Sequence, residues 1–157
     1  MAVLEFDDRS GYPDVHLGEG AARVLRSCLR ERGWVEVIDG HAARVEGRIV
    51  TEASEAVRVG ASLKAGFVVY GAVTGFALRS EVRNVLGTRQ KQTWAECTVE
   101  VRMVDVTSWH VVATQSARGV VEAGSLPPRR EYEDAVEGRF LRAAMEKLVP
   151  GLTAALR

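Results

Sequence analysis

The chain has 157 residues, of which 46% are hydrophobic and 27% are charged, a composition typical of one ordinary globular domain rather than a disordered chain. The 21 basic and 21 acidic residues balance to a net charge of zero, which argues against a dedicated nucleic-acid binder with its basic excess. A chain of this length buries a full core without metal or disulfide staples. No apolar run approaches the roughly 18 residues that a transmembrane helix needs.

Apolar periodicity predicts the elements in the first half of the chain. They are, in order, a strand at 2–6, a helix beginning at Leu17, a strand at 34–38 and a helix at about 52–64. The cluster at 7–11 predicts a turn after the first strand, and Gly33 is the expected residue just past the end of the first helix. Thr51 is the expected N-cap of the second helix, and Gly60 within that helix suggests a close backbone contact.

The second half predicts an antiparallel meander followed by a helix. Strands are expected at 67–78, 94–106 and 111–121, and the helix at about 131–149. In the middle strand, apolar residues alternate with polar ones from Ala95 to Met103, so one side of the sheet should be covered and the other should face water. The segment 125–128 breaks the chain before the last helix, and Pro150 with Gly151 is expected to kink or end that helix.

The order β-α-β-α-β-β-β-α predicts a single domain over residues 1–157, of the α/β class in its α+β form. A mixed sheet of about five strands is expected, with the antiparallel meander at one side. About three helices should pack on its covered face.

Two glycines imitate part of a nucleotide-binding motif. Gly18 and Gly20 lie between a strand and a helix, and Asp39 follows some 20 residues later, as in a dinucleotide fingerprint. The third glycine position holds Arg23, however, and a long loop precedes the glycines where the motif needs a tight turn. The alternative is that both glycines start a helix and pack closely.

No other set of residues predicts catalysis or metal binding. His16, His41 and His110 lie in separate segments without a second ligand three or four residues away. Cys28 and Cys97 are expected to be small buried hydrophobic residues, with a structural disulfide as the alternative. We therefore expect no enzyme, no cofactor and no metal.

Basic residues gather at two predicted links. Arg79, Arg83, Arg89 and Lys91 surround the first turn of the meander, and Arg129 and Arg130 lie between the last strand and the last helix. Alternating strand direction places both links at the same end of the sheet. Such a cluster suits anionic lipid headgroups or an acidic partner, and the alternative is a set of ordinary solvated loops.

Two tryptophans fall at predicted surface positions. Trp109 is expected at the tip of the opposite turn, where Gly or Asn is usual, and this placement suggests an interface. Folding back onto the sheet is the alternative for Trp109. Trp94 begins a strand in its polar register and is expected to cover the edge of the sheet.

Four segments in fixed order carry a family resemblance over nearly the whole chain. They are 2–11 (AVLEFDDRSG), 17–20 (LGEG), 68–76 (VVYGAVTGF) and 99–107 (VEVRMVDVT). Together they resemble the curli assembly/transport (CsgG-type) lipoprotein family. That family includes the curli secretion channel, exopolysaccharide-export ring lipoproteins and an LpoB-like activator of a peptidoglycan synthase.

The resemblance implies a non-catalytic domain in the periplasm, tethered to the outer membrane, with an anticodon-binding-like fold. Envelope proteins are the implied partners, a homo-oligomeric ring is left open, and no nucleic acid is involved. The implied membrane contact is a lipid anchor that this chain lacks. We expect that the lipid-bearing cysteine was removed with a signal sequence. The alternative is a cytoplasmic α/β domain that binds a small molecule or a nucleotide.

Three links depart from the pattern of the curli channel. Residues 80–90 and about 123–130 stand where that channel inserts long membrane hairpins. Both are too short for such hairpins, because one barrel strand alone needs about 9–11 residues, so we expect no self-built pore. The loop after the first strand, which forms the channel constriction in that family, is also short here and leaves Tyr12 as its candidate residue.

Overall fold

The computed structural model describes residues 1–12, 16–33, 36–40, 43–123 and 129–156. These residues hold six strands: β1 (Ala2–Leu4), β2 (Asp7–Asp8), β3 (Ile38–Gly40), β4 (Phe67–Val85), β5 (Thr88–Asp105) and β6 (Val111–Ala123). They also hold three helices: α1 (Leu17–Glu31), α2 (Ala53–Ser62) and α3 (Arg129–Ala154). The strands form one mixed sheet in the order β3-β1-β4-β5-β6, with β2 paired to β4. The predicted α+β fold with an antiparallel meander is confirmed.

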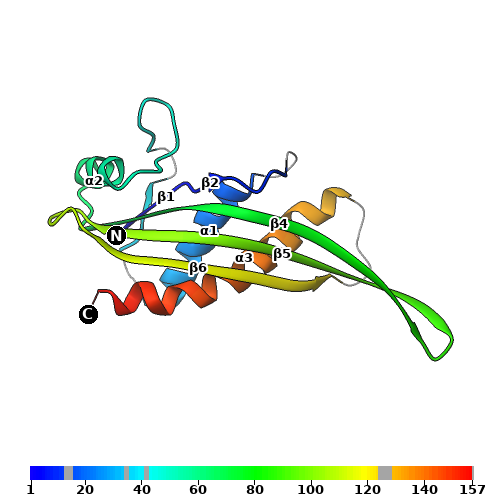
Figure 1. Cartoon of the computed structure of the whole chain (residues 1–157). Coiled ribbons are helices and arrows are strands. Elements are labelled where there is room, and N and C mark those ends of the chain that lie inside the picture. The colour runs from blue at the N-terminus through cyan, green and yellow to red at the C-terminus, as the bar shows by residue number, and fades with distance from the viewer. Residues whose placement is uncertain (13–15, 34–35, 41–42, 124–128, 157) are drawn as a thin grey trace.

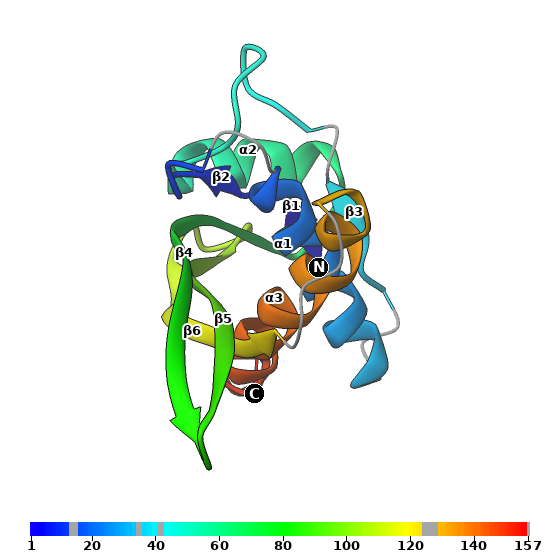
Figure 2. The same ribbon diagram turned by 90° about the vertical axis from the view of Figure 1, so that its right-hand side faces the viewer.

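Helices cover the two faces of this sheet unequally (Figures 1 and 2). The main core packs α1 and α3 on one face, where Leu25 and Phe140 lie against alternate residues of the strands such as Val99. The prediction that the helices share one face is wrong for α2, because α2 packs at one end of the other face. A smaller core forms there, in which Val57 belongs to the cluster around Tyr70. The alternation predicted for β5 is confirmed, since its odd-numbered residues from Ala95 to Met103 are buried.

Helix α1 begins and ends close to where the sequence predicts. Its apolar residues recur at helical spacing and are buried, and Gly33 follows the helix at a φ of 87°, the left-handed conformation that glycine adopts without strain. The turn predicted at 7–11 begins later than expected, because Asp7 and Asp8 pair with β4 as strand β2. Asp8 still has a turn function, since its carboxylate accepts hydrogen bonds from Ser10 and from the backbone N–H of Leu17.

Helix α2 differs from the prediction at its start. Glu52, not Thr51, is the N-cap residue, and its side chain makes no capping hydrogen bond. The close contact expected at Gly60 is confirmed in a modified form. A Cβ at Gly60 would lie 2.5 Å from methyl groups of Val68 and Val106, so the helix approaches side chains of the sheet rather than backbone.

Helix α3 does not end at Pro150 but continues to Ala154. Proline removes one hydrogen bond from a helix interior, and tertiary packing compensates here. Leu152 is fully buried in the main core, and Gly151 lies so close to β6 that a Cβ would overlap the side chain of Gln115. Residues 125–128, predicted to break the chain before this helix, lie outside the described residues.

The largest departure is in the meander. The sequence predicts a strand that ends near residue 78 and a link over 80–90, whereas β4 and β5 remain paired as far as Val85 and Thr88. Strand β3 is also shorter than predicted, and Trp34 and Val35 at its expected start lie outside the described residues.

Candidate interaction surface

Strands β4 and β5 extend past the rest of the sheet as a two-stranded ribbon (Figure 1). Strand β6 pairs with β5 only as far as Ala123, which lies opposite Thr93. Beyond this pair, residues 81–85 of β4 and 88–92 of β5 have no third strand beside them in the described part of the chain. We call residues 80–93 the hairpin arm. Its two-residue turn is Leu86–Gly87, with φ values of 51° and 81°, which is the type I′ geometry that matches the twist of a hairpin.

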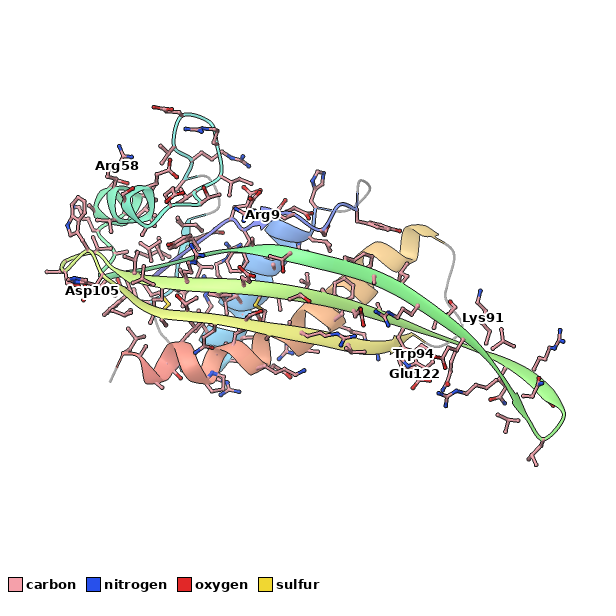
Figure 3. All side chains as sticks on the ribbon, viewed as in Figure 1. Arg9, Arg58, Lys91, Trp94, Asp105 and Glu122 are labelled. Carbon is pink, nitrogen blue, oxygen red and sulfur yellow. The ribbon has the colours of Figure 1, made fainter. Side chains whose placement is uncertain are left out.

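The hairpin arm and its base carry four of the predicted site residues. Arg79, Arg83, Arg89 and Lys91 are placed on strands and not in a loop, because the turn has only two residues. Arg83 pairs with Glu81 at 3.2 Å. Within the part of the chain that the structure describes, Arg89 and Lys91 have no hydrogen-bond or ion-pair partner. Lys91 projects outward from the ribbon (Figure 3).

Arg129 and Arg130 form the first two residues of α3. The helix starts at the same end of the sheet as the hairpin arm, as the strand directions predict (Figure 1). The structure does not describe the side chains of these two arginines. Their membership of one basic cluster with the arm therefore stays a prediction.

The sheet face opposite α1 and α3 is open between α2 and the hairpin arm (Figure 2). We call this surface the outer face. It is formed by Gly75, Ala77, Arg79, Trp94, Glu96, Thr98, Arg118, Val120 and Glu122. An ionic cluster crosses its three strands: the Glu96 carboxylate on β5 lies 3.2 Å from the Arg79 guanidinium on β4 and also binds Arg118 on β6. The hydrogen bond from Arg118 holds the pKa of Glu96 below its usual value.

The outer face also exposes apolar groups beside this ionic cluster. Val120 is 46% exposed, and Trp94 is half-buried in the row Arg79–Trp94–Glu122 across the three strands. The prediction that Trp94 covers a sheet edge is wrong, because β5 lies between two neighbouring strands. Trp94 and Glu122 lie together at the base of the hairpin arm (Figure 3). A mixed apolar and ionic surface of this kind suits a protein contact.

Trp109 lies at the opposite end of the sheet, in the turn between β5 and β6. It has a φ of 65° and is 62% exposed, so it does not fold back onto the sheet. The Asp105 carboxylate accepts hydrogen bonds from the backbone N–H groups of Thr107 and Ser108, which fixes the turn. Val111 and Val112 continue the exposed apolar surface next to Trp109.

Tyr12, the remaining predicted site residue, packs edge-on against Phe76, with ring centroids 4.8 Å apart. Phe76 in turn contacts Phe140 of α3 at 5.2 Å. These contacts tie the loop after β2 to the main core. A role for Tyr12 in a constriction stays a prediction.

The two glycines of the apparent nucleotide motif pack against protein. A Cβ at Gly18 would lie 2.0 Å from the backbone oxygen of Phe6. The N–H of Leu17 at the start of α1 already donates to the Asp8 carboxylate at 3.1 Å. Backbone and a carboxylate therefore occupy the place at this helix start where a phosphate would bind, which supports the packing alternative.

Three buried titratable groups belong to the packing of the fold: Cys28, Cys97 and Arg26. Cys28 and Cys97 are both buried and free, as predicted, and burial raises the pKa of the Cys97 thiol to about 11. Arg26 is buried on α1, where burial lowers its pKa and Asp39 pairs with it at 2.8 Å. Within the described residues, no group of three His, Cys, Asp or Glu side chains could hold a metal ion. No helix in those residues has the length and apolar character needed to cross a membrane.

Sequence reasoning found the basic residues of the hairpin arm but missed its structure and the outer face. The signal for the arm was the pair Leu86–Gly87. A residue followed by glycine, between segments with β-branched residues such as Val85 and Thr88, is typical of a two-residue hairpin turn. The signal for the outer face was the polar alternation of β5, which indicated an uncovered side but not its partners across the neighbouring strands.

Comparison with known proteins places the fold. No family model and no curated protein matches the sequence. Among solved structures, a PelC dodecamer from Paraburkholderia phytofirmans matches with a TM-score of 0.58 and 18% identity, over 96% of this chain and 86% of that one. Lipoprotein GNA1162 from Neisseria meningitidis matches with a TM-score of 0.53 and 15% identity, over 95% and 98% of the two chains.

The C-terminal domain of LpoB from Salmonella enterica also matches, with a TM-score of 0.50 and 14% identity, over 78% of this chain and 82% of that one. Identities this low establish structural likeness and leave membership of the CsgG-type family as an expectation from the sequence motifs. The chain therefore has an α+β fold that is shared with PelC, GNA1162 and the C-terminal domain of LpoB.

Proposed function

We propose that residues 1–157 are a single, non-catalytic accessory domain of a cell-envelope lipoprotein, acting in the periplasm next to the outer membrane. The domain would scaffold or regulate an assembly, secretion or peptidoglycan-synthesis machine through protein contacts. The observation that carries the proposal is the match to lipoprotein GNA1162, which spans 95% of this chain and 98% of that one. The sequence motifs add membership of the CsgG-type family to the proposal.

Assembly into a homo-oligomeric ring is part of the same proposal. Its support is the likeness to PelC from Paraburkholderia phytofirmans, which is a dodecamer in two solved structures. A ring requires two different surfaces on each copy, because each copy contacts one neighbour with each surface. The outer face and the turn that carries Trp109, Val111 and Val112 are two such surfaces, at separate places on the molecule.

The oligomeric state tests the ring directly. Light scattering on the purified chain over rising concentration should give a mass that is a multiple of the monomer. The Trp109→Asn variant removes the exposed indole side chain. Asparagine tolerates positive φ, so the variant should stay folded while its measured mass shifts toward that of the monomer. Arg58→Gln on α2 is the matched surface control (Figure 3). A wild-type chain that stays monomeric at high concentration would contradict the ring.

The envelope location needs a separate experiment in the source cell. The gene with its native upstream region should yield a protein that takes up labelled palmitate and fractionates with the outer membrane. An unlabelled product in the cytosolic fraction would contradict the lipoprotein proposal, whatever the oligomeric state.

A further inference from the structure

The tip of the hairpin arm carries an apolar residue where local stability favours a polar one. Leu86 is 100% exposed at a φ of 51°. Left-handed backbone is unfavourable for a leucine, and the first position of such a turn is usually Asn, Asp or Gly. Val85 beside it is 44% exposed. Neither packing nor turn geometry in this chain accounts for a leucine at the tip.

Cations follow directly behind this tip on both faces of the ribbon. Residues paired across two antiparallel strands share a face, so the pairing register gives the face of each side chain. Arg83, opposite Gln90, lies on the side of the ribbon that is continuous with the outer face, beyond the residues that form it, whereas Arg89 and Lys91, opposite Asn84 and Val82, lie on the other side. The three cations therefore surround the ribbon instead of forming one charged side.

Polarity on the arm thus changes along its axis. Leu86 and Val85 lie at the tip. Along the ribbon from the Val85–Thr88 pair, at about 3.4 Å for each residue pair, the cations lie roughly 3–10 Å behind it. Glu81 is the one acidic residue of the arm, and it is paired with Arg83 at 3.2 Å. A groove on a protein would contact one face of the ribbon, whereas a bilayer surrounds an inserted tip on all sides.

We propose that the hairpin arm inserts its tip end-on into the interface of an anionic lipid bilayer. Leu86 and Val85 enter the boundary of the acyl chains, while Arg83, Arg89 and Lys91 contact lipid phosphates. Insertion is shallow, because charges this close to the tip stop deeper entry. This contact is separate from the proposed lipid anchor and from the ring, since it uses neither the outer face nor the Trp109 turn.

Vesicle binding by the purified chain tests the tip residue. Vesicles of phosphatidylethanolamine with phosphatidylglycerol should bind the chain, and phosphatidylcholine vesicles should bind it much less. Leu86→Asn removes the apolar side chain while it improves the turn. We expect about tenfold weaker vesicle binding with an unchanged or higher midpoint of thermal unfolding, so lost binding cannot be attributed to misfolding.

The cations are tested by charge removal and by salt. Arg89→Gln with Lys91→Gln should weaken binding to the anionic vesicles by about fivefold for each charge, and added salt should weaken the wild type more than this double variant. Arg58→Gln, an exposed cation on α2, should leave binding unchanged. Equal binding to both kinds of vesicle, or wild-type binding by the arm variants, would overturn the proposal.

An environment-sensitive dye reports which end of the sheet meets the lipid. Attached at Leu86→Cys, its emission should shift to the blue on anionic vesicles, whereas the same dye at Ser108→Cys in the opposite turn should not shift. The native thiols do not interfere, because both are buried with raised pKa values. A blue shift at Ser108→Cys alone would show that the other end binds and would refute the arm.

Discussion

Gly119 of β6 sets the distance between the sheet and α3. A Cβ at this position would lie 2.1 Å from the backbone oxygen of Phe140 and 2.8 Å from the backbone nitrogen of Ala144. Both atoms belong to the main chain of the helix and cannot rotate away. The Cys97 thiol, opposite Gly119 on β5, donates a hydrogen bond to the same Phe140 oxygen at 3.6 Å. The Gly119→Ala variant must therefore move the helix or the strand.

The size of the effect follows from what has to move. Overpacking of a core typically destabilises by about 1–3 kcal/mol and occasionally by more. Because rigid backbone lies on both sides of the added methyl group, we expect the upper end, about 3 kcal/mol. A domain of this length loses about 2–4 °C of melting temperature for each kcal/mol, so the midpoint should fall by roughly 6–12 °C.

Urea denaturation followed by circular dichroism measures this difference. The matched control is Gly138→Ala within α3, where a Cβ would meet no atom within 4 Å from the described residues outside its own helical turn. In a helix interior this change should stabilise by up to about 1 kcal/mol. The two substitutions add the same methyl group and should act in opposite directions. A Gly119→Ala variant that unfolds at the wild-type urea concentration would refute the argument that this glycine sets the helix position.

Three further predictions concern thiols, acid and α2. Cys28 and Cys97 should resist a thiol reagent at pH 8 until unfolding, because burial raises the pKa of both and the thiolate is the reactive form; earlier labelling would contradict this. The pKa of Glu96 lies below its usual 4.5, so its stabilisation is present above pH 4.5 and lost as pH falls through the lower folded-state value. Glu96→Gln should then flatten the acid side of the stability curve measured in urea. Gly60→Ala should destabilise by about 1–2 kcal/mol in urea, since the facing methyl groups of Val68 and Val106 rotate only partly.

The parts of the fold predicted well are those that local patterns determine. Alternation of apolar and polar residues from Ala95 to Met103 identified the covered face of β5. Apolar residues at helical spacing, followed by Gly33, located α1. Prediction failed where tertiary contacts override local preference. Helix α3 passes through Pro150 because the buried Leu152 holds its last turn in the main core.

The hairpin arm was missed for a different reason. Its strands have no core beside them, so residues such as Arg83, Asn84 and Gln90 show no alternation of apolar and polar positions. Hydrogen bonds between β4 and β5 hold the ribbon, and backbone pairing leaves little trace in composition. The basic residues could be identified from the sequence, but their arrangement around a ribbon depends on the pairing register.

Leu86 and Trp109 are two turn residues whose side chains do not suit the local stability of their turns. Both are large apolar residues at positive φ, both are exposed, and they occupy the two opposite turns of one meander. A turn selected for stability alone would carry Asn or Gly at such positions. Because each apolar side chain works against the local backbone without adding to the core, both positions fit the contacts proposed for them, with lipid at Leu86 and with a second copy of the chain at Trp109. The two turns face away from each other along the sheet (Figure 1), so the contact proposed at Leu86 and the contact proposed at Trp109 use separate surfaces and do not compete.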